Sequence, residues 1–189
     1  MTPASVRDER QNLILEAASH LVCEGSAEAV TMAQLAAKTG LSRPAIYQYF
    51  ASREHVLAEL VINEIADLSN EIDSHIAKID DPMEQIRVWI HYSLAHLASP
   101  SHRAIREISI DYLPEQSRGM LRAMHGHLMT SLVHPLREIN VADVTATCHF
   151  IYAAISAAAT RISEGSPYER EAAALERFTI AGITQKPRP

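Results

Sequence analysis

The 189-residue sequence has few cysteines and glycines and no long apolar run. Its two cysteines, Cys23 and Cys148, belong to no CxxC or Cys/His cluster, which excludes a zinc finger, an iron–sulfur site and a disulfide scaffold. A chain of this length buries about 70% of the surface that it exposes when unfolded, so it needs neither disulfide nor metal for stability. We therefore expect both thiols to be ordinary buried small residues.

Membrane and secretion signals are missing as well. No apolar stretch approaches the roughly 20 residues that cross a bilayer. Residues 1–10 carry four charged side chains in place of the apolar core of a cleavable signal. These features predict a cytoplasmic protein.

Enzyme signatures are equally scarce, since the chain has no Gly-rich phosphate loop, GxSxG elbow or HExxH motif. Ten histidines are the remaining candidates for metal chemistry. His125 and His127, two residues apart, point to different sides of a helix, and no carboxylate or cysteine lies beside them at chelating spacing. We expect no cofactor and no metal. An all-helical enzyme or metal protein that uses the C-terminal histidines stays an alternative.

The charge distribution gives more information than the net charge of −6. An acidic chain is a poor partner for a polyanion on bulk electrostatics alone. Residues 38–53, however, contain three basic side chains and no acidic one. The sequence thus places a small positive window inside an acidic protein.

Apolar residues recur at helical spacing along the whole chain, and strand alternation is nearly absent. Capping residues, Gly25, Gly40 and several prolines mark where helices begin and end. The pattern predicts an all-α fold of about nine helices. They cover approximately residues 10–24, 31–39, 42–49, 52–79, 82–98, 101–112, 115–138, 141–163 and 167–183.

The second and third predicted helices, joined at Gly40, form a candidate helix-turn-helix. At 100° per residue Ile46, Tyr49 and Phe50 lie on the side of the third helix that packs inward. The opposite face carries Pro44, Ala45, Tyr47 and Gln48 beside Arg43. A merely solvated helix favours Lys and Glu, whereas these side chains suit base edges and thymine methyl groups in a DNA groove. An ordinary αα-corner is the alternative.

Residues 31–54, TMAQLAAKTGLSRPAIYQYFASRE, resemble the DNA-binding segment of the TetR family of transcriptional regulators, and ILEAA at 14–18 resembles that family's first helix. The resemblance implies residues 1–52 as a helix-turn-helix domain and residues 53–189 as a helical effector-binding and dimerisation domain. It implies a homodimer on a pseudo-palindromic operator. The DNA-binding residues expected from motif position and cap chemistry are Thr31, Ser42, Arg43, Pro44, Ala45, Tyr47, Gln48, Tyr49 and Arg53. At position 53 the family usually has lysine.

The last two helices are the expected dimer surface, since residues 151–162 combine small and branched apolar side chains and residues 172–183 offer a second apolar face. An intrachain core is the alternative for both. A small apolar or amphipathic effector is expected among the middle helices. The candidate pocket residues are Trp89, Tyr92, His96, Met120, Met124, Leu128, His149 and Tyr152. A plain core is an equally good interpretation of any single one of these residues. The resulting hypothesis is a ligand-responsive regulator, most often a repressor, without enzyme activity.

Overall fold

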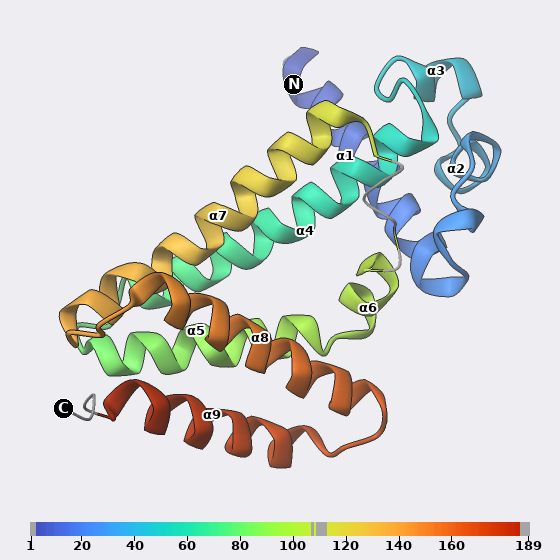
Figure 1. Cartoon of the computed structure of the whole chain (residues 1–189). Coiled ribbons are helices and arrows are strands. Elements are labelled where there is room, and N and C mark those ends of the chain that lie inside the picture. Colours follow the sequence, from blue (N-terminus) through green and yellow to red (C-terminus); the bar gives the residue numbers. More distant parts are fainter. Residues whose placement is uncertain (1–2, 107, 109–112, 186–189) are drawn as a thin grey trace. The chain divides into compact units, whose positions relative to one another are not determined.

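The computed structural model describes residues 3–106, 108 and 113–185, and within them it contains helices and no strand. This confirms the all-α prediction (Figure 1). The elements are α1 (Pro3–Glu24), the short 3-10 helix η1 (Ala27–Ala29), α2 (Met32–Thr39), α3 (Arg43–Tyr47), α4 (Arg53–Ile76), α5 (Pro82–Leu97), α6 (Pro100–Arg106), α7 (Glu115–Glu138), α8 (Val144–Ser163) and α9 (Tyr168–Thr184).

The chain forms two compact units that do not follow a single cut of the sequence. The first comprises residues 1–64 and 100–124, and the second comprises 65–99 and 125–189, so the boundary falls within α4 and α7. The predicted boundary between residues 52 and 53 divides a DNA-binding part from an effector-binding part, and not one compact unit from another. That functional division stays a prediction.

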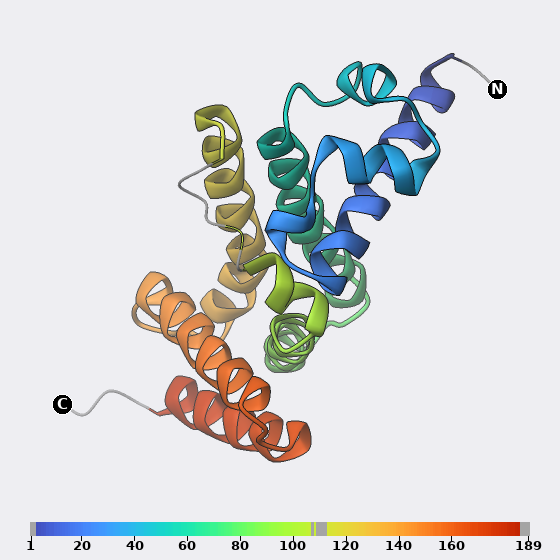
Figure 2. The same ribbon diagram turned by 90° about the vertical axis from the view of Figure 1, so that its right-hand side faces the viewer.

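In the first unit α1 packs against η1, α2 and α6, and α2 packs against α3. Figure 2 shows α1, α2 and α3 gathered at one end of this unit. Their shared core contains Ile14, Leu35, Ile46 and Phe50, all fully buried. Complete removal of such side chains from water supplies about 1.5–3 kcal/mol each. This core fixes the short α3 on its longer neighbours.

The second unit is built on α5, α8 and α9, which pack against one another, with α8 and α9 running side by side (Figures 1 and 2). Its core includes the fully buried Trp89, whose indole Nε1–H donates to the carbonyl of Leu128 at 3.3 Å and to Ser131 Oγ at 3.2 Å. These bonds satisfy the one polar atom of a large apolar ring.

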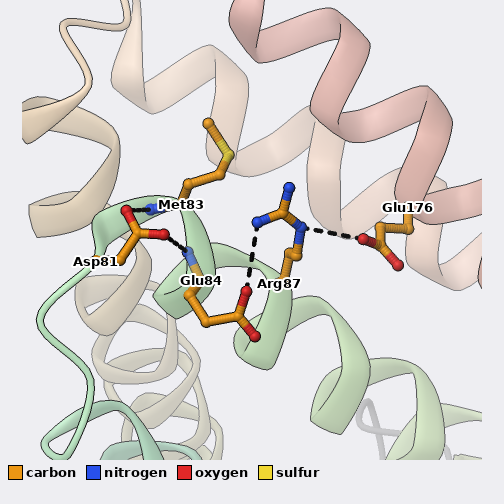
Figure 3. Close-up of polar contacts among 5 residues, drawn as sticks. All are labelled: Asp81, Met83, Glu84, Arg87 and Glu176. Atoms are coloured by element: carbon orange, nitrogen blue, oxygen red, sulfur yellow. Dashed lines mark hydrogen bonds and ion pairs between the residues drawn. The ribbon is translucent and has the colours of Figure 1, made fainter.

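Polar contacts fasten α5 to α9 at the surface of this unit (Figure 3). Asp81 caps α5 by accepting the backbone N–H groups of Met83 at 3.3 Å and Glu84 at 3.2 Å. Arg87 then donates from Nη1 to Glu84 at 3.3 Å and from Nε to Glu176 of α9 at 3.1 Å. This cap starts α5 at Pro82, which confirms the predicted start of that helix.

Some predicted boundaries differ from the structure. Helix α8 begins at Val144, later than predicted, because the Asp143 side chain accepts the Ala146 N–H at 2.9 Å and caps it there. Asn140, the residue before the predicted start at 141, has a φ of 58° and lies in the turn after α7. The predicted helix 101–112 is described as far as Arg106, and residues 107 and 109–112 lie outside the described residues.

One of the two cysteine predictions is wrong. Cys148 is buried on α8, where burial raises the pKa of its thiol, as expected for an inert core cysteine. Cys23 is exposed on α1, because it follows the buried Leu21 and Val22 and turns to the opposite side of the helix. None of the helices in the described part of the chain has the length and apolar character needed to span a bilayer.

Candidate DNA-binding site

The first helix of the candidate helix-turn-helix begins and ends as its sequence predicts. Thr31 accepts the Gln34 N–H at 3.1 Å and caps α2, and Leu35 is fully buried beneath it. Gly40 ends the helix with a φ of 70°, in the left-handed region where a side chain would be strained. The turn that follows leads the chain directly into α3.

Helix α3 buries one face and exposes the other. Ser42 caps it by accepting the Ala45 N–H at 3.3 Å, while Ile46 and Phe50 are fully buried, as predicted. Tyr49, expected to face inward, is half-buried. The outward face is formed by the exposed Arg43, Pro44, Tyr47 (54% exposed) and Gln48 and by the half-buried Ala45. The structure therefore gathers the predicted groove-facing residues on one accessible strip.

The turn from α3 into α4 is fixed by His55, a residue that the sequence analysis did not single out. The Ala51 N–H donates to His55 Nδ1 at 3.2 Å. The ring packs edge-on against Phe50, with centroids 5.5 Å apart, and Ser52 Oγ accepts the His55 N–H at 3.2 Å. The four-residue spacing from Ala51 to His55 is compatible with this hydrogen bond, but a histidine at that spacing can bond to many other groups. The sequence alone therefore does not predict the contact.

Arg53 is engaged within the protein. Its Nε donates to the carbonyl of Val30 at 2.8 Å and its Nη2 to the carbonyl of Ala27 at 2.7 Å, while Nη1 lies 3.4 Å from Glu54 Oε1. Sequence reasoning placed this guanidinium at the DNA and missed these acceptors, because they lie more than 20 residues away along the chain.

The positive window is weaker than its composition indicates. Lys38 pairs with Glu24 at 2.7 Å, and this pair lowers the pKa of the Glu24 carboxyl. The Arg53 guanidinium donates to the carbonyls of Val30 and Ala27. Of the three cations in the window, Arg43 is the one on the outward strip of α3.

The candidate effector residues do not all belong to one unit. Trp89 and Leu128 are in the core of the second unit, and Tyr92 and Tyr152 are half-buried against that core. Six of the eight residues lie in this second unit, whereas Met120 and Met124 belong to the first. Their role in binding an effector stays a prediction.

Histidines of the second unit have separate partners. His127 lies 3.9 Å from Asp73, and His125 packs edge-on against Tyr152 with centroids 5.2 Å apart. The two histidines therefore face different neighbours, as their spacing predicts.

A cavity of about 1050 Å³ lies along α8, α9 and the turn that precedes α8. Its lining includes Phe150 and Phe178, which are 72% and 71% exposed. Phe178 lies within the apolar face predicted for residues 172–183, whereas no sequence pattern singled out Phe150. Ile151, Ile155, Ala158 and Ala159, expected at a dimer surface, are buried in the core of their own unit.

Comparison with known proteins agrees with this architecture. Residues 14–60 match the family model for bacterial regulatory proteins of the tetR family. The HTH-type transcriptional regulator HbdR of Aromatoleum sp. (strain CIB) is 24% identical over 185 residues, which cover 87% of this chain and 81% of HbdR. Other curated HTH-type regulators match over 31 to 53% of their own length.

Two solved structures share the fold. The transcriptional regulator FadR from Bacillus subtilis, in complex with stearoyl-CoA, superposes with a TM-score of 0.76 at 15% identity, over 90% of this chain and 97% of FadR. AibR, in complex with isovaleryl coenzyme A and operator DNA, gives a TM-score of 0.71 at 16% identity, over 89% of this chain and 97% of AibR. Residues 14–60, which contain the capped α2–turn–α3 segment, are therefore similar to the DNA-binding segment of bacterial regulatory proteins of the tetR family.

Proposed function

We propose that the chain is a homodimeric repressor that binds a pseudo-palindromic operator and leaves it when a small amphipathic effector binds. The observation that carries this proposal is the outward strip of α3, an exposed and largely uncharged face held on a fully buried one. Such a face loses little by leaving water for a DNA groove, and it carries groups that discriminate bases.

Contacts along the strip divide into readout and positioning. Gln48 has the amide that reads adenine N6 and N7, Arg43 reaches guanine or a phosphate, and Pro44 with Ala45 lies against a thymine methyl. The hydroxyls of Thr31, Ser42, Tyr47 and Tyr49 are assigned to phosphates, which set register without reading sequence. Thr31 and Ser42 are the caps of α2 and α3, so both hydroxyls lie at helix starts.

A pseudo-palindromic operator requires two helix-turn-helix heads, one from each subunit, because successive major grooves on one face of DNA lie about 34 Å apart. We assign the subunit contact to α8 and α9. Phe150 and Phe178 support this assignment, because large aromatic side chains more than two-thirds exposed beside an apolar cavity are unusual on a monomer. Aromatic residues of this kind are typical anchors of protein interfaces.

The effector class is drawn from the pocket chemistry and from the two structures with the same fold. The candidate pocket residues combine apolar side chains with histidine and tyrosine, which suits an amphipathic molecule. FadR holds stearoyl-CoA and AibR holds isovaleryl coenzyme A, and both ligands join an apolar acyl chain to an anionic nucleotide. An acyl-coenzyme A is accordingly the effector that we propose to test first.

Release requires that the effector bind the state unable to hold DNA more tightly than the state that holds it. A coupling free energy of about 1–3 kcal/mol lowers operator affinity roughly 5- to 150-fold. Neither step requires chemistry on the effector.

The test is selection of duplexes from a random pool by the purified full chain, followed by binding of the selected duplex with and without acyl-coenzyme A. We expect an inverted-repeat sequence, and roughly 5- to 150-fold weaker binding with either stearoyl-CoA or isovaleryl-CoA. Choline serves as a non-acyl control. Failure to enrich any sequence would refute DNA-binding regulation and favour the enzyme or metal alternative, whereas enrichment without a response to either acyl-CoA would refute the effector class.

A further inference from the structure

Arg53 makes a two-pronged contact that ties the start of α4 to the chain just before α2. Nε and Nη2 donate to the carbonyls of Val30 and Ala27 at 2.8 and 2.7 Å, both short for N–H···O bonds. Val30 is fully buried and Ala27 nearly so, and both precede the Thr31 cap. The guanidinium therefore grips the segment that sets where α2 begins.

The geometry of this contact requires arginine. A guanidinium presents parallel N–H donors in a rigid plane, which suits two acceptors side by side. Lysine ends in one nitrogen on a flexible stem, so it cannot reproduce both bonds at the same lengths and directions. The third nitrogen of Arg53 lies 3.4 Å from Glu54, whose carboxylate offsets part of the positive charge.

The consequence for α3 follows from the order of elements. Helix α3 lies between the two ends that Arg53 connects, and it is only five residues long. On one side the Gly40 turn links it to α2, and on the other the His55 turn links it to α4. A clamp between the start of α2 and the start of α4 thus limits how far α3 can tilt.

We propose that Arg53 is a positioning residue that holds the recognition helix at its binding angle, in place of the phosphate contact that the family resemblance implies. This inference rests on the proposed function only in so far as its first readout uses DNA. The Arg53 contacts are already formed in the free protein. Their contribution to DNA affinity therefore does not depend on the release of counterions from DNA.

Salt dependence distinguishes the two roles. A phosphate contact contributes about 0.9 to the slope of log affinity against log salt, for each head. We expect Arg53→Ala to weaken binding to the selected duplex by roughly tenfold or more at every salt concentration, with the wild-type slope retained. Arg53→Lys should recover less than half of that loss on a logarithmic scale. Arg43→Ala, which removes an exposed cation from the outward strip, is the matched control whose slope should fall.

A second measurement needs no DNA. Hydrogen–deuterium exchange of the full chain should quicken at the amides of residues 28–35 in both Arg53 variants and stay at the wild-type rate in Arg43→Ala. This readout keeps the inference testable even if no operator is found, and it detects a variant that has unfolded as a whole.

Two results would each overturn the inference. One is a slope reduced by about 0.9 per head in Arg53→Ala with full recovery in Arg53→Lys, the pattern of a simple phosphate contact. The other is unchanged exchange at residues 28–35 in both variants.

Discussion

At the scale of single residues, we assign DNA sequence specificity to side chains that make no structural contact within the protein. Among the polar residues near α3, Ser42 is used as a cap, His55 holds a turn and Arg53 grips two carbonyls. Gln48 lies exposed at the C-cap position of α3, where only its backbone is engaged in the helix end. Its amide is therefore the one to which base discrimination is most directly assigned.

Replacing that amide should change preference more than affinity. We expect Gln48→Ala to lower discrimination at one base pair of each half-site by about 1–3 kcal/mol, because a bidentate amide–adenine contact is lost. Repeating the random-duplex selection with the variant measures this directly. Gln34→Ala, an exposed glutamine on α2, is the control and should leave the preferred sequence intact. An equal loss on every sequence from Gln48→Ala would contradict the assignment.

At the scale of elements, α8 and α9 are joined by a bidentate ion pair as well as by apolar packing. Arg161 donates from Nε and Nη2 to the two carboxylate oxygens of Glu171, each at 2.9 Å. The Glu171 side chain is 8% exposed and that of Arg161 57%. The hydrogen bonds from Arg161 hold the pKa of the Glu171 carboxyl below its usual value of 4.5.

This shift makes the pair a source of pH-dependent stability. A carboxyl whose pKa is lower when folded stabilises the fold fully above its unfolded pKa, and the stabilisation is lost as pH falls through the folded pKa. We expect Glu171→Gln to reduce the free energy of unfolding at pH 7 and to differ less from wild type as pH falls below about 4.5. Urea denaturation across pH measures the difference.

A double-mutant cycle with Arg161→Ala provides the control, because Glu171→Gln should lose most of its pH-dependent effect when the guanidinium is absent. A wild-type minus Glu171→Gln difference that is constant from pH 7 to pH 3 would show that the ion pair does not govern this stability.

At the scale of the whole molecule, the proposed function requires that two copies of the chain associate. Phe150 and Phe178 stay largely exposed beside a cavity of about 1050 Å³, although the second unit has a buried core of its own. Covering two such rings removes a large apolar area from water, and we propose that a second copy of the chain supplies the matching surface.

Placing a charge at this surface should separate the subunits. We expect Phe150→Glu and Phe178→Glu to give monomers in analytical ultracentrifugation, because each buries a carboxylate in the contact. Affinity for the selected duplex should fall roughly 10²- to 10⁴-fold, since the second head is no longer tethered to the first. Leu13→Glu, at a side chain 41% exposed on α1, is the control for oligomeric state and should stay dimeric. Dimers in both phenylalanine variants would place the subunit contact elsewhere.

The helices themselves were largely readable from the sequence because their signals are local. Thr31, Gly40, Ser42 and Asp81 act within four residues of their own position, and each does what its residue type predicts. The inward side of α3 followed from periodicity in the same way, as the burial of Ile46 shows. Local chemistry of this kind needs no knowledge of what lies across the core.

Long-range partnerships were decided by the tertiary structure alone. Arg53 and Ala27 are 26 positions apart, Lys38 and Glu24 are 14 apart, and nothing in residue type or spacing pairs them. Exposure was equally hidden, since Cys23 was predicted to be buried and is accessible, and Phe150 is exposed on a helix whose sequence did not single it out. The sequence determined the helices, their caps and the outward strip of α3, because each depends on neighbours within a turn or two. Tertiary packing brings together helices from distant segments of the chain. It alone decides which cations are left without an intramolecular partner and which apolar side chains stay exposed.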